Sequence, residues 1–200
     1  MRGLWNRNTV GSVLAATLLP VVAADLLTRG ASLHLPVGLL TVALWQMVFR
    51  IKQGAPLSAS GAVVAVSFSL LAAGDLAVWQ IALSVTFGVV LAELLFGGWG
   101  RNFLSAAVAA PAFAYMSFPE VLHPAPALLV AIGAGLSGII LLATGLIAWR
   151  VLIAAGVVTA LFSVGAGLPP DAAGALVFAA VFLLADPVAS SATQLGRPVY

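Results

Sequence analysis

The sequence predicts an all-α membrane protein whose chain crosses the bilayer about eight times. Of its 200 residues 62% are hydrophobic and only 7% are charged, and the mean hydropathy is +1.17. A soluble domain carries roughly a quarter of its residues as charges, so this composition indicates lipid as the solvent. Within a bilayer every backbone amide must be paired inside the structure, which favours helices. The apolar residues do not alternate in the segments of ~10 residues that a membrane barrel needs, so the sequence predicts a helical bundle.

Eight apolar segments follow one another along the chain, separated by polar or helix-breaking residues. They are residues 10–27, 35–49, 59–73, 78–96, 103–118, 125–148, 151–168 and 172–185. Several are shorter than the ~20 residues that span a hydrocarbon core of ~30 Å. Short segments of this kind either thin the bilayer or belong to discontinuous helices that the protein shields.

The segment at residues 103–118 is short and contains Pro111, so its crossing needs a separate argument. Cytoplasmic loops of membrane proteins carry most of the Lys and Arg residues. With eight crossings and a cytoplasmic N-terminus, seven of the eight basic residues lie on the cytoplasmic side and only Arg29 lies outside. Without this crossing Arg150 and Arg197 move outside, which leaves five inside. The charges therefore favour a crossing here and predict that both termini are cytoplasmic.

Composition also excludes several classes of protein. The pI near 9.7 rests on eight basic against six acidic residues, and the only tight basic cluster is residues 50–52, so no nucleic acid is expected as a partner. The absence of cysteine excludes disulfides, cysteine-ligated iron–sulfur clusters and thiolate zinc sites carried by this chain alone. His34 and His123 fall in predicted outer loops, which disfavours a haem between helices. The N-terminus has no Ala-x-Ala-like cleavage site, so the first apolar segment is expected to be a retained helix.

A glycine-rich turn is the first candidate site. It contains Gly97, Gly98 and Gly100, followed by Arg101 and Asn102. Glycines free the backbone for positive φ and for close approach by a ligand. The free amides at the start of the next helix are suited to an anionic or carbonyl group, and Arg101 adds a positive charge. Spacing alone favours the alternative, a tight cytoplasmic turn with a basic anchor.

Two acidic residues are the other candidates. Asp186 follows an unbroken apolar segment and precedes Pro187, and acids at membrane depth are costly and usually functional. The same Asp-Pro order suits an N-cap, and the two interpretations are compatible. Glu93 lies within the fourth apolar segment, where it pairs with Arg101, lines an ion pathway or extends to the interface. No spacing indicates a catalytic or metal-binding set.

Two separated signatures resemble those of a known family. The first is Trp79-Gln80-x-Ala82-Leu83-x-x-Thr86-Phe87-Gly88-Val89-Val90, with Glu93 and Phe96-Gly97-Gly98-x-Gly100-Arg101-Asn102-Phe103 after it. The second is Asp186-Pro187-Val188 with Ser190, preceded at a distance by Ala148-Trp149-Arg150. Together they resemble the NqrB/RnfD family, which comprises membrane subunits of the sodium-translocating NADH:quinone reductase and of the Rnf ferredoxin:NAD complex. The likeness runs in order from about residue 10 to the C-terminus.

The resemblance implies a fold of ten helices in two inverted five-helix repeats, similar to urea and ammonium channels. One transmembrane domain is then expected over residues 1–200, with a first repeat at about 10–118 and a truncated second repeat at about 125–200. The chain would be about two helices short of ten. Another integral membrane subunit of a respiratory or photosynthetic complex, or a second copy of this chain, is expected to cover the exposed face. A bacterial inner (cytoplasmic) membrane is the expected location.

The resemblance also implies that the glycine turn and the second acidic site lie near a flavin or quinone on the cytoplasmic side. The residues concerned are Gly97, Gly98, Gly100, Arg101, Asn102 and Asp186. Two departures from the family pattern affect this. Family members attach FMN to a Thr in a loop equivalent to residues 119–124, which hold no Ser or Thr here, and their Asn-Pro after the glycine turn is Ser105-Ala106.

The predicted function is therefore a membrane subunit of an electron-transfer complex, auxiliary or structural, without covalent flavin. The alternative is a redox-active subunit that binds a non-covalent riboflavin, FMN or quinone and is coupled to ion translocation. A small channel or transporter is a weaker alternative that follows from fold analogy alone. In each case the chain is at most a subunit of an oxidoreductase and has no complete active site of its own.

Overall fold

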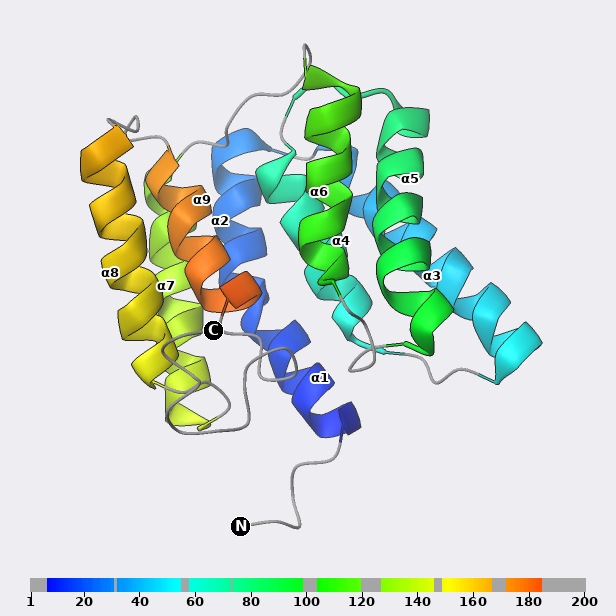
Figure 1. Ribbon diagram of the computed structural model, residues 1–200, viewed down its shortest axis with the longest axis horizontal. Coiled ribbons are helices and arrows are strands. Elements are labelled where there is room, and N and C mark those ends of the chain that lie inside the picture. The colour runs from blue at the N-terminus through cyan, green and yellow to red at the C-terminus, as the bar shows by residue number, and fades with distance from the viewer. Residues whose placement is uncertain are drawn as a thin grey trace. The chain divides into compact units, whose positions relative to one another are not determined.

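The computed structural model describes residues 7–30, 32–54, 58–72, 74–98, 104–119, 127–145, 149–166 and 172–184 (Figure 1). In these ranges the regular structure is helical and no strand is present. The helices are α1 (Arg7–Thr17), α2 (Leu19–Arg29), α3 (His34–Gln53), α4 (Ser60–Leu71), α5 (Val78–Thr86), η1 (Phe87–Glu93), η2 (Leu94–Phe96), α6 (Ala106–Ser117), α7 (Ala127–Ala143), α8 (Trp149–Ala166), α9 (Ala172–Phe178) and η4 (Ala179–Leu184).

Each of the eight predicted apolar segments contains helix, which confirms the all-α class. Among the described residues, three stretches are long and apolar enough to cross a membrane, namely Thr9–Thr28, His34–Gln53 and Val78–Phe96. Shorter apolar helices include Ser60–Leu71 and Ala106–Ser117. The number of crossings, eight, stays a prediction.

The first predicted segment is interrupted by a turn at Leu18. The Leu18 amide donates to the carbonyl of Ala15 at 3.2 Å, and a new helix, α2, begins at Leu19. Pro20 falls in the first turn of this helix, where the amide that proline lacks has no helical acceptor. One apolar segment therefore holds two helices.

The chain divides into two compact units. Unit 1 consists of residues 1–18 and 30–124, and unit 2 of residues 19–29 and 125–200. The helix α2 is thus grouped with the C-terminal helices, although the chain reaches it before the greater part of unit 1. The division of the chain into two inverted repeats stays a prediction.

The core of unit 1 is built around α4. Every residue from 63 to 70 is buried, with Phe68 completely enclosed. A helix that is apolar on all sides lies in a protein core or faces lipid, and the burial of α4 places it in the core. Helices α1, α3 and α6 pack against it, while α3 also packs against α5 (Figure 1).

The helix at residues 78–96 changes its winding twice. It is α-helical to Thr86, a π-helix through η1 and a 3₁₀ turn through η2. The side of η1 at Gly88 lies directly against α6, because a Cβ at Gly88 would stand 2.6 Å from the Cβ of Ala110 and 2.9 Å from the carbonyl oxygen of Ala106. Small residues on both helices therefore permit this close approach, as in many membrane helix pairs.

Unit 2 is packed around α7, which contacts α2, α9 and η4. A Cβ at Gly133 would stand 2.8 Å from the carbonyl oxygen of Pro20, and one at Gly138 would stand 3.1 Å from Val181. At Gly135, on another face of α7, no described atom lies within 4 Å of that position. The dense glycines of α7 thus serve close helix packing at two of three positions.

Candidate functional site

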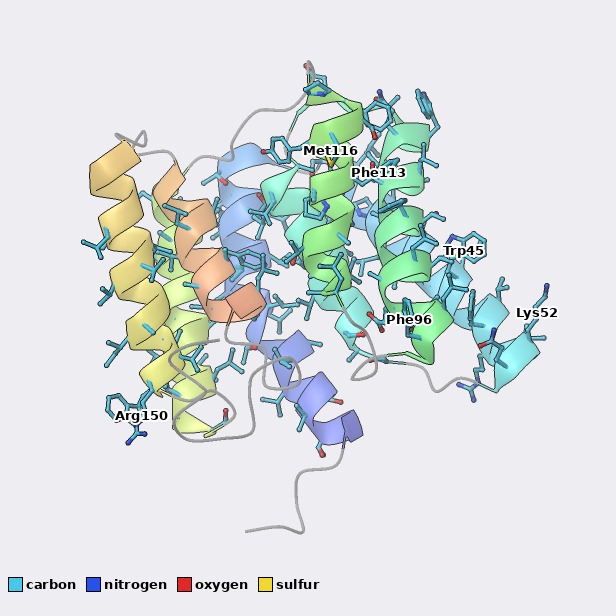
Figure 2. All side chains as sticks on the ribbon, viewed as in Figure 1. Trp45, Lys52, Phe96, Phe113, Met116 and Arg150 are labelled. Carbon is cyan, nitrogen blue, oxygen red and sulfur yellow. The ribbon has the colours of Figure 1, made fainter. Side chains whose placement is uncertain are left out.

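Polar groups gather where three elements of unit 1 end or begin. The helix α3 ends at Gln53, α4 begins at Ser60 and η2 ends at Phe96. Figure 2 shows Lys52 and Phe96 at the lower end of their helices. The glycine turn predicted from the sequence begins directly after Phe96, so this end of unit 1 holds the first candidate site.

Glu93 is buried at this end, with only 3% of its surface exposed. It is the last residue of η1, and its Oε1 accepts a 2.8 Å hydrogen bond from the Oγ of Ser60 on α4. A carboxylate away from water is costly unless polar groups solvate it, and intramembrane acids are usually functional for that reason. The side chain is therefore held inside the unit by a group from another helix.

Two more side chains extend this contact. The Oγ of Ser58 donates to the Oγ of Ser60 at 2.9 Å, and the Ser60 amide donates back to the Oγ of Ser58 at 3.2 Å. On α3, the Nε2 of Gln46 donates to the carbonyl oxygen of Ser58 at 3.0 Å. The helix α3, the start of α4 and the end of η1 are thus joined by one network of hydrogen bonds.

Sequence reasoning did not single out Ser58, Ser60 or Gln46. The only signal in the sequence is a pair of serines just before an apolar run, which is common at helix N-termini. Nothing local links Ser60 to Glu93, because the two residues are 33 positions apart.

The glycine turn adopts the positive φ that its sequence predicts. Gly97 has φ 96° and Gly98 has φ 92°, both in the region that L side chains rarely enter. The Gly97 amide donates to the carbonyl of Leu94 at 3.2 Å, and the Gly98 amide donates to the carbonyl of Glu93 at 3.1 Å. No described atom lies within 4 Å of a Cβ built on Gly98, so backbone conformation rather than crowding favours glycine there.

Four of the predicted site residues, Gly100, Arg101, Asn102 and Asp186, lie outside the described residues. The structure therefore brings together Glu93, Gly97 and Gly98 from the predicted set. Among the described residues no three His, Asp or Glu side chains gather closely enough to hold a metal ion. The cofactor-binding role of the glycines stays a prediction.

One expectation about a histidine and one departure from the family pattern can be compared with the structure. His34, expected in an outer loop, is instead the first residue of α3 and is buried. Ser105, which stands in place of the family's Asn, is the N-cap of α6. Its carbonyl accepts hydrogen bonds from the amides of Val108 and Ala109, while its side chain makes no cap hydrogen bond.

Several residues of the first signature shape unit 1 itself. The Oε1 of Gln80 accepts a 2.8 Å hydrogen bond from the amide of Ala77 and closes the start of α5. The indole of Trp79 meets the ring of Phe118 edge-on, with 5.6 Å between ring centres. With Gly88 at the η1–α6 contact, these residues have structural roles that need no ligand.

Comparison with known proteins matches residues 6–127, more than half of the chain, to the model of the NQR2, RnfD, RnfE family. A Na(+)-translocating NADH-quinone reductase subunit from Chromohalobacter salexigens is 38% identical over 93 residues, or 45% of this chain. The subunit of the same name from Yersinia pestis is 36% identical over 121 residues, or 58% of this chain. The aligned part covers only 23% and 29% of these two relatives. The apolar helices and this match identify a multi-pass membrane protein, and the chain belongs to the NQR2, RnfD, RnfE family.

Proposed function

We propose that this chain is an auxiliary or structural membrane subunit of an electron-transfer complex and carries no covalent flavin. Membership of the family supports the complex, because the matched relatives are named as subunits of a Na(+)-translocating NADH-quinone reductase. In this role the chain packs against other membrane subunits and does not itself carry out the redox chemistry.

The observation that carries the auxiliary role is the hydrogen bonding of the glycine turn. Both glycine amides that the structure describes, those of Gly97 and Gly98, donate to carbonyls of the helix before the turn. An anion or carbonyl held at a helix N-terminus needs amides that are still free. The described part of the turn thus supplies no free donor of this kind for a flavin phosphate or a quinone oxygen.

The sequence of residues 119–124 supports the absence of covalent flavin. A phosphoester to the protein needs a side-chain hydroxyl, and residues 119–124 are Pro-Glu-Val-Leu-His-Pro. The hydroxyls nearest in sequence are those of Ser117 and, in the N-terminal direction, Tyr115, both on α6. Treatment with alkali, which releases phosphoester-linked flavin, is therefore expected to release none from the purified chain.

Cofactor content tests the proposal directly. The complex is purified in mild detergent through a tag on this chain, and its flavin absorbance and extracted quinone are measured against protein. We expect no flavin or quinone that depends on this chain. A stoichiometric cofactor that is lost in Gly98→Val or Asp186→Ala, while the complex stays assembled, would overturn the proposal.

The second candidate is a redox-active subunit that binds riboflavin, FMN or a quinone without a covalent bond and is coupled to ion movement. Its support is the buried Glu93, which lies directly before the positive-φ turn and accepts a hydrogen bond from Ser60. Under this alternative Glu93 lies on the ion pathway. The cofactor measurement above decides between the two candidates.

The proposed partners are other integral membrane subunits of a respiratory or photosynthetic complex, or a second copy of this chain. The proposed location is the bacterial inner membrane with both termini in the cytoplasm, which places seven of the eight basic residues on the cytoplasmic side. Cross-linking of membranes through a cysteine introduced at Met116, a residue that is 85% exposed, identifies the neighbour by mass. The chain has no native cysteine to compete.

The channel or transporter alternative has a separate test. Purified chain is reconstituted into vesicles, and the uptake of urea, ammonium and sodium is compared with that of empty vesicles. Under the auxiliary proposal the rates are equal.

A further inference from the structure

In the polar network at the Glu93 end of unit 1, the hydroxyl of Ser58 donates to that of Ser60, which donates to the carboxylate of Glu93. We propose that Ser58 and Ser60 form a proton relay that loads and unloads the carboxylate of Glu93. The inference rests on the second candidate function only in placing Glu93 on an ion pathway, and it names the ion as the proton.

The distances suit proton transfer. The Oγ of Ser58 donates to the Oγ of Ser60 at 2.9 Å, and the Oγ of Ser60 donates to the Oε1 of Glu93 at 2.8 Å. Both lie within the ~2.6–3.2 Å over which a positioned group passes a proton. Each of the two serine oxygens also accepts a hydrogen bond, so the chain of donors is continuous.

Burial increases along the relay. Ser58 is half-buried and follows the end of α3, whereas Ser60 is 6% exposed and Glu93 is 3% exposed. A proton that enters at Ser58 therefore moves from the surface toward the interior. The backbone carbonyl of Glu93 accepts the Gly98 amide, so the relay ends beside the glycine turn.

The transfer balances at each oxygen. A hydronium ion at the surface gives a proton to the Oγ of Ser58 and becomes water, and the hydroxyl proton of Ser58 passes to the Oγ of Ser60. The proton of Ser60 passes in turn to the Oε1 of Glu93. At each serine one O–H bond breaks and one forms, so both end as neutral hydroxyls, and the net change is one proton on the carboxylate. Unloading reverses these steps.

A metal cation fits the same group less well. Hard cations collect about six or more oxygen ligands with lone pairs directed at the ion. The Oγ of Ser58 already accepts the Ser60 amide, and the Oγ of Ser60 already accepts the hydroxyl of Ser58. The described groups of the network are one carboxylate and two hydroxyls that each have one lone pair already in use, which is fewer than six ligands and favours the proton.

In the part of the chain that the structure describes, few charged or titratable side chains lie on the elements around the relay. The elements packed against η1 are α3, α5, α6 and η2, and α4 supplies Ser60. Their described titratable side chains, besides Glu93, are His34, Arg50, Lys52 and Tyr115. His34 begins α3, at the end opposite Lys52, and the Tyr115 hydroxyl donates to the carbonyl of Leu71 at the far end of α4. Within the described part of these elements, Arg50 and Lys52 therefore stand at the end where the relay begins.

Infrared spectroscopy tests the relay in the full chain. The 200-residue protein is reconstituted in lipid nanodiscs, and difference spectra are recorded over a pH titration in H₂O and D₂O. We expect a carboxyl C=O band that Glu93→Gln removes. In Ser60→Ala the band shifts to higher frequency, because it loses a hydrogen bond, and its hydrogen–deuterium exchange slows by on the order of a hundredfold.

Two variants separate the relay from a general loss of packing. Ser60→Thr keeps the hydroxyl and is expected to retain the band and its exchange rate. Ser67→Ala removes another buried hydroxyl of α4, one that donates to the carbonyl of Val63 in its own helix, and is expected to change neither.

The relay is wrong if Ser60→Ala exchanges as fast as the parent chain, or if Ser67→Ala slows exchange equally. The relay is also wrong if sodium chloride at constant pH removes the carboxyl band of the parent chain but has no such effect in Ser60→Ala. That result would show a cation site at these residues. These outcomes do not depend on cofactor content or complex assembly. Failure of the relay and failure of the proposed function are therefore distinguishable.

Discussion

The indole nitrogen of Trp45 donates a 2.9 Å hydrogen bond to the hydroxyl oxygen of Thr86. Trp45 lies on α3, and Thr86 is the last residue of α5, directly before the chain widens into η1. The bond thus ties α3 to the residue at which the π-helix begins. π segments are rare and are frequently found at functional sites, so a bond that holds the start of η1 also holds the end of unit 1 at which Glu93 lies.

Thr86→Val tests the strength of this tie. Valine keeps the shape of threonine but cannot accept the indole hydrogen, so we expect a loss of about 0.5–1.5 kcal/mol in the free energy of unfolding. Reversible unfolding in mixed detergent micelles measures it, and a double-mutant cycle with Trp45→Phe isolates the pair. Thr41→Val is the matched control, because the Thr41 hydroxyl donates to the carbonyl of Val37 in its own helix. Equal losses in both variants would argue against the tie.

Gly88→Ala tests the contact between η1 and α6. The added methyl would stand 2.6 Å from the Cβ and 2.7 Å from the amide nitrogen of Ala110, and backbone cannot move aside cheaply. We expect a loss of about 1–3 kcal/mol, measured by thermal unfolding in detergent. Gly156→Ala on α8 has no described atom within 4 Å of its Cβ and is expected to be neutral or to gain up to about 1 kcal/mol. A Gly88→Ala protein as stable as the parent would contradict the close approach.

Two glycines of α7, Gly133 and Gly135, provide a better-matched comparison because they lie on the same helix. Gly133→Ala places a methyl 2.8 Å from the carbonyl oxygen of Pro20, whereas Gly135→Ala places one where no described atom lies within 4 Å. Both changes raise helix propensity by the same amount, so the difference between them isolates packing. We expect Gly133→Ala to be the less stable by about 1–3 kcal/mol in thermal unfolding. No difference would mean that α2 and α7 do not approach as described.

The glycine turn is expected to tolerate asparagine better than valine. At Gly98, φ is 92°, and a side chain there has space but an unfavourable backbone. Asn enters the left-handed region more readily than a β-branched residue does, by about 1–2 kcal/mol. Thermal unfolding of Gly98→Asn and Gly98→Val should show this order. The reverse order would indicate that crowding, not conformation, selects glycine.

The eight helical segments could be predicted because lipid demands long apolar runs and leaves little else to decide. What the sequence could not predict is the winding inside a run. The helix at residues 78–96 is apolar on most sides, so its pattern does not distinguish 3.6 residues per turn from a wider or tighter helix. The apolar pattern does not predict the turn at Leu18 for the same reason, although Pro20 is a usable signal.

The candidate site was half predictable. Glu93, Gly97 and Gly98 stand out because a charge and paired glycines are rare in such a chain. Ser60 does not stand out, since serines at helix starts are common and its partner is 33 residues away. Burial along α4 does distinguish Ser60, because this serine is the first residue of a helix in which nearly every side chain is buried. That burial is known only from the structure.

The grouping of α2 with unit 2 has a consequence for the order of events during synthesis. This helix is made early, yet α7, against which it packs, is made roughly a hundred residues later. At ribosomal rates of about 5–20 residues per second, α2 waits on the order of ten seconds for its partner. During that interval the face of α2 that later packs against Gly133 is not covered by α7. An insertase or chaperone that protects this chain is therefore needed at α2, between the synthesis of α2 and that of α7.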